Sequence, residues 1–278
     1  MKKKWAKLGA LGLAVMLAGC SSAQPASESE AQTEAETTAT ETEEAEAEQD
    51  GPAPIEQVWS PVDENGDMKR DDRDATGENG IVTSANVYAS QAGLQVLEQG
   101  GNAVDAAVAV AYALGVVEPQ ASGIGGGGFM LVHTADGQDS FVDYREVAPA
   151  AQDAYTWLDE NGEVKNGGLA NQRGGLAIGV PGEVAGMEYA LEHFGSGNVT
   201  RQQVMQPAID LAEKGYLVST YQSQLINDHY GDMVGDYPVL GSYYLREDGL
   251  PYQNGDVFRN PDLAKTLKLI AENGKDVF

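Results

Sequence analysis

Short apolar runs and small-residue helical segments alternate with turn residues after residue 80, which predicts a mixed α/β domain. Residues 81–83 predict a short buried strand. Residues 89–99 predict a helix that ends at Gly100 and Gly101, because a left-handed C-terminal cap favours glycine. Asn102 can cap the next helix, 103–117. The many alanines of that helix would let a neighbouring layer approach closely, so we expect it to be central and buried.

Residues 129–133 and 140–144 alternate around Asp136 and Gly137, which is the pattern of a β-hairpin. A helical block follows and begins with a helix from Pro181-Gly182 to about Phe194. Later helix starts carry capping signals, which are Thr200 with Gln203, Ser219 with Gln222, and Asn260 before Pro261. The final helix is expected over 262–272. Strands and helices in this order predict a layered sheet with helices packed on its faces.

The first twenty residues predict a lipoprotein signal (1–20). Four lysines precede an apolar run over 8–17, which is too short for a permanent membrane span. Small residues then lead to Cys20, the only cysteine of the chain, so it has no partner for an internal disulfide. A buried structural thiol is the alternative, but the flanking residues favour lipid attachment. We therefore expect an extracytoplasmic protein that a lipid anchors to a bacterial membrane.

Residues 21–79 predict an acidic tether and lead-in before a domain over 80–278. Residues 26–50 hold ten acidic residues and no aromatic, branched aliphatic or basic residue, so this segment has no apolar surface to bury. The whole chain carries a net charge of −26. A charge of this sign disfavours binding to nucleic acid.

Four consecutive glycines, Gly125 to Gly128, separate the alanine-rich helix from the first hairpin strand. Glycine loses more conformational freedom on folding than any other residue, so the chain must need bare backbone here. Nucleotide-binding loops follow a strand and open a helix, whereas here the order is helix, glycines, strand, and no lysine follows. We instead expect the glycines to allow tight packing and unusual backbone angles beneath a site.

Arg145 is the main candidate for ligand binding. It ends the second hairpin strand, and its guanidinium can form two parallel hydrogen bonds with a carboxylate. The alternative is a salt bridge to an acidic neighbour such as Asp143 or Glu146. Spacing alone does not decide between these two roles.

The order and spacing of several segments resemble the heavy chain of the gamma-glutamyltransferase family, within the N-terminal-nucleophile hydrolases. The resemblance extends from about residue 81 to residue 278. It is carried by residues 100–109, 118–120, 123–130, 144–146, 180–182 and 184–186. This family implies a four-layer αββα sandwich, of which the sequence would hold the N-terminal half.

The resemblance also implies a division of the active site. Arg145 would bind the α-carboxylate of the γ-glutamyl group, and a threonine at a new N-terminus would be the nucleophile, with its own amine as the base. The expected threonine two positions before a histidine is absent, because Leu131, Leu191 and Asn227 stand there. The family's oxyanion-stabilising serine and glycine pairs are absent as well. We therefore interpret the sequence as truncated or split, with the nucleophile expected beyond Phe278.

The implied reaction cleaves γ-glutamyl amides such as glutathione and transfers the glutamyl group to water or an amino acid. The expected partner is a C-terminal light chain from the same precursor. One alternative is a poly-γ-glutamate depolymerase or transpeptidase, and another is a non-catalytic lipoprotein that binds γ-glutamyl compounds. No cofactor is expected. No metal is expected either, because His133, His193 and His229 are too far apart in the sequence for a local ligand motif and are best explained as polar surface residues.

Overall fold

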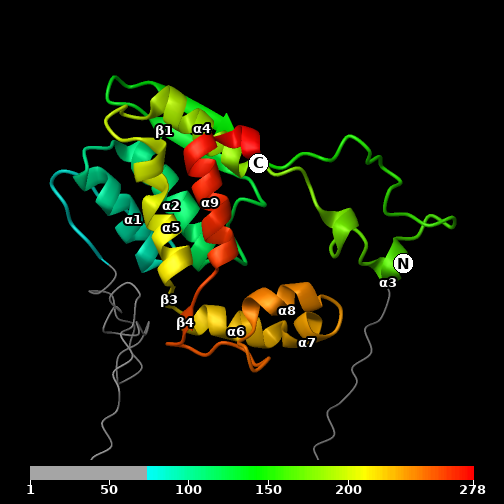
Figure 1. Ribbon diagram of the computed structural model, residues 1–278. Helices are drawn as coiled ribbons and strands as arrows, with labels where there is room; N and C mark the ends of the chain where they lie inside the picture. Colours follow the sequence, from blue (N-terminus) through cyan, green and yellow to red (C-terminus); the bar gives the residue numbers. More distant parts are fainter. Residues whose placement is uncertain (1–73) are drawn as a thin grey trace, which may run out of the picture. The chain divides into compact units, whose positions relative to one another are not determined.

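The computed structural model describes residues 74–278 (Figure 1). The predicted signal (1–20), Cys20 and most of the acidic tether and lead-in therefore lie outside the described residues. The described part combines helices with two small antiparallel sheets, so the predicted mixed α/β class is confirmed. None of the helices between residues 74 and 278 is both long and apolar enough to cross a membrane.

The helices and strands come in the following order along the chain. The helices are α1 (Val87–Glu98), α2 (Ala103–Val117), α3 (Lys165–Gly168), α4 (Glu183–Phe194), α5 (Arg201–Lys214), α6 (Thr220–Asp228), α7 (Tyr230–Val234), α8 (Pro238–Tyr244) and α9 (Pro261–Asn273), with 3₁₀ turns η1 (Gly175–Ala177) and η2 (Lys275–Val277). The strands are β1 (Phe129–His133), β2 (Asp139–Asp143), β3 (Tyr216–Leu217) and β4 (Val257–Phe258).

The turn between α1 and α2 forms as predicted. Gly100 has a φ of 93°. The amide of Gly101 donates to the carbonyl of Val96 at 3.0 Å, which together with Gly100 gives a Schellman cap. Asn102 then caps α2, and Asp105 completes a reciprocal capping box. These bonds explain why α2 has the predicted bounds, whereas α1 begins two residues early because Asn86 caps it.

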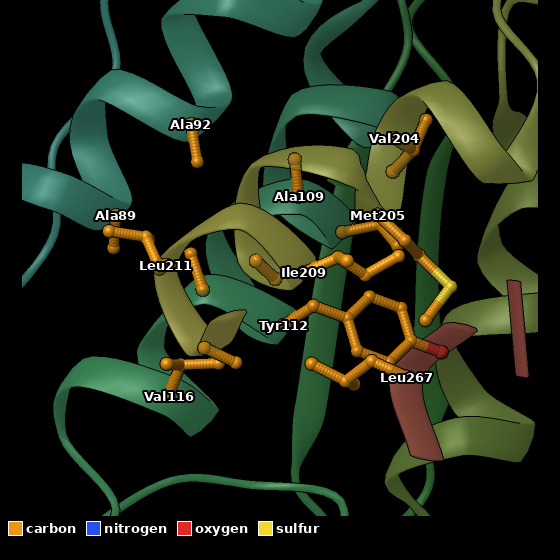
Figure 2. Close-up of a cluster of buried hydrophobic side chains, with 14 of the residues drawn as sticks. Ala89, Ala92, Ala109, Tyr112, Val116, Val204, Met205, Ile209, Leu211 and Leu267 are labelled. Carbon is orange, nitrogen blue, oxygen red and sulfur yellow. The ribbon is translucent and has the colours of Figure 1, made fainter. Parts of the chain in front are cut away.

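Helix α2 lies at the centre of the helical layer, as predicted. It packs against α1, α4 and α5, and α5 packs in turn against α9. Figure 2 shows Ala109 and Tyr112 of α2 among the side chains of Met205, Ile209 and Leu267, all of which are buried. The small alanine side chains of α2 let these neighbouring helices approach, and the larger residues of α5 and α9 fill the space between them.

Asp105 also joins α2 to the end of α4. Its buried carboxylate accepts hydrogen bonds from the amides of Asn102 at 2.9 Å and Ser196 at 3.0 Å. The side-chain amide of Asn102 donates to the carbonyl of Phe194 at 2.7 Å. One capping unit therefore fixes the start of α2 and the end of α4 together, because each buried polar group finds a partner there.

The predicted hairpin is confirmed, with β2 displaced by one residue. Phe129 pairs with Asp143 and His133 pairs with Asp139. Val132 and Val142 are buried on the face toward the helices. On the opposite face, apolar side chains remain exposed among the described residues, namely Phe129, Leu131 and Phe141.

The segment 81–83 is a correction to the sequence prediction. It forms no strand, and Ile81 is 55% exposed. Among residues 74–278, no strand pairs with this segment, so its backbone runs without ladder hydrogen bonds. The side chain of Val82 instead packs against Gly93 of α1. A β-carbon added to Gly93 would lie only 2.8 Å from Cγ1 of Val82.

The later helix starts also follow the predicted caps. Thr200 and Gln203 form a full capping box at α5, and Asn260 caps α9 with Pro261 in its first turn. Ser219 caps α6, but the side chain of Gln222 does not complete a box there. It donates instead to the hydroxyl of Tyr216 at 2.8 Å. The two-residue strands β3 and β4 were missed because they are too short to show a period.

Candidate functional site

The glycine loop connects α2 to β1, and its geometry partly corrects the sequence prediction. Within residues 118–128, only Gly123 has a positive φ, of 139°, and it lies before the four consecutive glycines. Gly125 to Gly128 do not have such angles, so the prediction of unusual backbone angles for them was wrong. The prediction of tight packing is confirmed at Gly127 and Gly128, where an added β-carbon would press on Tyr144.

Three glycines contact Tyr144, one from the glycine loop and two from the start of α4. A β-carbon on Gly127 or Gly182 would overlap the Tyr144 carbonyl, and one on Gly186 would overlap the base of its ring. We call Gly127, Gly182 and Gly186 the glycine triad. Backbone contacts this close require residues without a β-carbon, so the triad fixes the end of β2 against the loop and α4.

Backbone hydrogen bonds hold the same parts together. The carbonyl of Gly126 accepts from the amides of Gly182 at 2.9 Å and Glu183 at 3.0 Å. The amide of Tyr144 donates to the carbonyl of Gly128 at 3.0 Å. The glycine loop is thus bound on one side to the first turn of α4 and on the other to the residue that precedes Arg145.

Arg145 is exposed directly beside this fixed backbone. Its amide donates to Oδ1 of Asp143 at 3.1 Å. No carboxylate of residues 74–278 lies within 4.0 Å of its guanidinium, so the alternative salt bridge to Asp143 or Glu146 does not form in the described part of the chain. The guanidinium therefore presents its donors at the surface, where a ligand carboxylate can reach them.

Glu183 is the titratable group that sequence reasoning missed at this site. Burial raises the pKa of Glu183 to about 7, and the nearby Glu146 carboxylate acts in the same direction. Burial and then the charge of Glu183 raise the pKa of Tyr144 to about 12. In the sequence, Glu183 is marked only by its place after the Pro181-Gly182 helix start, which predicts a helix boundary and no titratable site.

A cavity of about 200 Å³ lies beside the glycine loop. Gly123, Ile124 and Glu183 line it together with residues of α2 and α9. Arg145 does not line this cavity. Arg145 is therefore exposed to solvent, whereas Glu183, whose pKa is raised, lines the cavity.

All three histidines are exposed at the surface, as predicted. His133 pairs with Asp139 at 2.7 Å, and His229 pairs with Asp232 at 3.1 Å. His193 stacks on Tyr189. Residues 74–278 contain no group of three or more His, Cys, Asp or Glu side chains placed to hold a metal ion.

The sequence of residues 89–278 matches the family model described as gamma-glutamyltranspeptidase. The chain belongs to the gamma-glutamyltranspeptidase family. This match spans the glycine loop, Arg145 and the glycine triad, so it confirms the resemblance that those segments carried.

Individual relatives agree with this family. The chain is 47% identical over 201 residues to a glutathione hydrolase proenzyme of Pseudomonas sp. (strain A14), a match that covers 72% of this chain and 34% of the relative. It is 38% identical to the glutathione hydrolase proenzyme of Escherichia coli (strain K12), over the same shares of the two chains. The chain thus spans about a third of the length of these curated relatives.

A solved structure gives the same relationship. The crystal structure of Helicobacter pylori gamma-glutamyltranspeptidase matches with a TM-score of 0.68 at 41% identity. The match covers 71% of this chain and 55% of that chain. The fold of this family member is therefore that of gamma-glutamyltranspeptidases, an N-terminal-nucleophile hydrolase fold of which the described residues form part.

The raised pKa of Glu183 predicts a specific pH dependence of stability in this gamma-glutamyltranspeptidase family member. The folded state holds the proton more tightly than the unfolded chain, whose glutamates titrate near 4.5. This contribution is complete below the unfolded pKa and is lost as the pH rises through about 7. A glutamine side chain cannot ionise, so Glu183→Gln should not lose this contribution as the pH rises. The difference in free energy of unfolding between the variant and wild type should therefore shift in favour of the variant by on the order of 1 kcal/mol from about pH 5 to about pH 8.

Chemical denaturation at both pH values measures this difference. Glu192→Gln, which changes an exposed glutamate on the same helix, is the matched control and should follow the wild-type pH profile. If Glu183→Gln also followed the wild-type profile, this would contradict the conclusion that folding raises the pKa of Glu183.

Proposed function

We propose that this chain is the substrate-binding part of a gamma-glutamyltransferase and glutathione hydrolase. The observation that carries the proposal is the Arg145 guanidinium, exposed on a backbone that the glycine triad fixes and without a carboxylate partner among the described residues. Its planar fork matches the α-carboxylate of a γ-glutamyl group. The family match and the relatives named glutathione hydrolase proenzymes support this substrate class.

The proposed reaction needs a nucleophile that a C-terminal light chain would supply. A threonine hydroxyl of that chain attacks the γ-carbonyl carbon, and its own α-amine accepts the hydroxyl proton. The amide bond breaks as the leaving amine takes up that proton. Water or the amine of an amino acid then attacks the glutamyl ester and restores the hydroxyl. Arg145 would hold the donor throughout, so that the carbonyl stays within reach of the nucleophile.

The exposed hairpin face supports the proposed light-chain partner. Phe129 and Phe141 stack with ring centres 5.5 Å apart, and Leu131 is 75% exposed beside them. An apolar sheet face of this kind favours burial against another layer. We propose that the light chain covers it, as the second sheet of the sandwich.

The other functions weighed from the sequence receive less support. The relatives' names favour glutathione as substrate over poly-γ-glutamate. A non-catalytic γ-glutamyl-binding lipoprotein would need no light chain, and the exposed apolar face of the hairpin argues for one.

Arg145→Ala tests the proposed function. The chain would be co-produced with the C-terminal part of the Pseudomonas sp. relative, and hydrolysis of γ-glutamyl-p-nitroanilide would be measured. Loss of a charge-assisted bond pair should raise KM by roughly 10-fold to 100-fold. Arg145→Lys should recover only part of this loss, because an ammonium group lacks the planar fork.

Arg246→Ala is the matched control, because Arg246 pairs with Asp248 at the surface and should leave KM unchanged. An unchanged KM in Arg145→Ala would contradict the assigned role of Arg145. Absence of hydrolysis in every wild-type combination, with both parts folded and associated, would contradict the enzymatic function itself.

We also propose that the protein is a lipoprotein, anchored outside the cytoplasm through Cys20. The basic start, short apolar run and single cysteine of residues 1–20 support this location. The acidic tether would then separate the domain from the bilayer.

Metabolic labelling with radioactive palmitate in a bacterial host tests this anchor. Wild type should carry the label and sediment with membranes, whereas Cys20→Ser should lose both properties, because no other cysteine is present to replace it. Membrane sedimentation of an unlabelled wild-type protein would contradict lipid attachment.

A further inference from the structure

Two polar side chains without a partner line the cavity of about 200 Å³ beside the glycine loop. Helix α2 contributes Tyr112, and the first turn of α4 contributes Glu183. Much of the remaining wall is apolar, with Val116, Ile124 and Leu267 among its residues. Neither Tyr112 nor Glu183 has a role in the reaction proposed above, so the function of this cavity is a separate question.

The hydroxyl of Tyr112 is free to bond with an occupant of the cavity. Tyr112 is only 3% exposed, yet no described residue lies within hydrogen-bond distance of its hydroxyl. Among the residues of 74–278 that are not exposed, Oε1 of Gln222 is the single side-chain N or O atom that is both fully covered and unpartnered. The Tyr112 hydroxyl is therefore not fully covered, and the cavity is the open space that this residue lines. Figure 2 shows the Tyr112 ring beside Leu267, which lines the same cavity.

Glu183 is half-buried and has no counter-ion in the described part of the chain. No lysine, arginine or histidine nitrogen of residues 74–278 lies within 4.0 Å of its carboxylate or of the Glu146 carboxylate, which acts on it by like-charge repulsion. Glu188 and Arg201 act on the Tyr112 hydroxyl, but they pair with one another at 2.7 Å. The two unpaired carboxylates therefore give the cavity wall at Glu183 a negative potential, which attracts a cation.

The size and walls of the cavity favour an organic cation over a metal ion. Residues 74–278 contain no group of three or more His, Cys, Asp or Glu side chains placed to hold a metal. An apolar cavity of about 150 Å³ accepts benzene, so one of about 200 Å³ accommodates a hydrocarbon body of roughly six carbons together with a small head group. The apolar part of the wall would bury such a body.

We propose that this cavity binds a small primary ammonium ion with a compact hydrocarbon body, whose head group donates to the Glu183 carboxylate and to the Tyr112 hydroxyl oxygen. A cavity of this volume is only a few ångströms across, so one head group can reach both side chains. An ammonium group has three donors and no acceptor, which matches a carboxylate and a hydroxyl that both lack a donor. Glu183 then selects for charge, and the apolar wall selects for size.

Cyclohexylamine tests the proposal, since it is a primary ammonium ion at neutral pH with a six-carbon ring. Cyclohexanol has nearly the same shape without the charge. Each would be titrated at pH 8 into the ¹⁵N-labelled full 278-residue chain and followed by two-dimensional NMR, which also shows whether the chain is folded. The amine should bind with a dissociation constant on the order of 1 mM and shift the amide signals of Gly123 and Ile124, and cyclohexanol should bind at least about tenfold more weakly.

The pH dependence of amine binding identifies Glu183 as the anion. With a pKa of about 7, Glu183 is about nine-tenths ionised at pH 8 and about one-tenth ionised at pH 6, so the affinity should fall about tenfold between these pH values. The other groups that face Glu183 are the Glu146 carboxylate and the hydroxyls of Tyr112 and Tyr144. Burial raises the pKa of both tyrosines, so they keep their protons across this range.

Two conservative variants test the head-group contacts. Glu183→Gln should weaken amine binding at pH 8 at least about tenfold and remove its pH dependence, whereas Glu192→Gln, an exposed change on the same helix, should bind as wild type. Tyr112→Phe removes only the hydroxyl and should weaken binding by roughly threefold to tenfold.

Two further variants locate the bound ring. Leu263→Trp would fill the cavity from α9 and should weaken amine binding at least about tenfold, whereas Leu269→Trp changes an exposed leucine of the same helix and should have no effect. Leu131→Ser, on the exposed hairpin face, should also bind as wild type.

Several results would overturn the proposal. Absence of amine binding to the folded wild-type chain would mean that the cavity takes up water only. Equal affinity for the amine and the alcohol, or an unchanged pH dependence in Glu183→Gln, would remove the role of Glu183. Loss of binding in Leu131→Ser, or full binding in a folded Leu263→Trp variant, would place the probe outside this cavity.

Discussion

The close contact between Tyr144 and the glycine triad is the constraint on which the candidate site depends. Gly127, Gly182 and Gly186 leave no room for a β-carbon, so β2, the glycine loop and α4 meet in close contact. Arg145 follows Tyr144 directly, so this contact also fixes the position of the Arg145 backbone. An exposed arginine on a free loop would lose conformational entropy on binding a carboxylate, whereas a fixed backbone has already lost part of it.

The helices connect the contact at Tyr144 to the hydrophobic core. The first turn of α4 contacts Tyr144 through Gly182 and Gly186, and the end of α4 is tied to α2 through the buried carboxylate of Asp105. Helix α2 in turn is enclosed by α1 and α5. The hydrophobic core thus positions both ends of the helix that supports Tyr144. The exposed apolar face of the hairpin is the part of this arrangement that the described residues leave uncovered.

Local signals in the sequence predicted most of the helices and the hairpin. Caps such as Asn102 and Thr200 depend on residues three positions away, so their bounds were predicted to within one or two residues. The failures concern distant contacts. Residues 81–83 have a strand-like composition, but the described residues contain no strand that pairs with them. The sequence of the glycine loop does not show that its glycines are needed for close contact with Tyr144 rather than for unusual backbone angles.

The contact between Tyr144 and the glycine triad is tested most directly by the free energy of unfolding of Gly127→Ala compared with Gly125→Ala. Both replace one glycine of the same loop with alanine, but a β-carbon at Gly125 meets no atom within 4 Å, whereas one at Gly127 overlaps the Tyr144 carbonyl. The contact predicts that Gly127→Ala loses about 1–3 kcal/mol of stability while Gly125→Ala stays within about 0.5 kcal/mol of wild type. Equal stability of the two variants would contradict it.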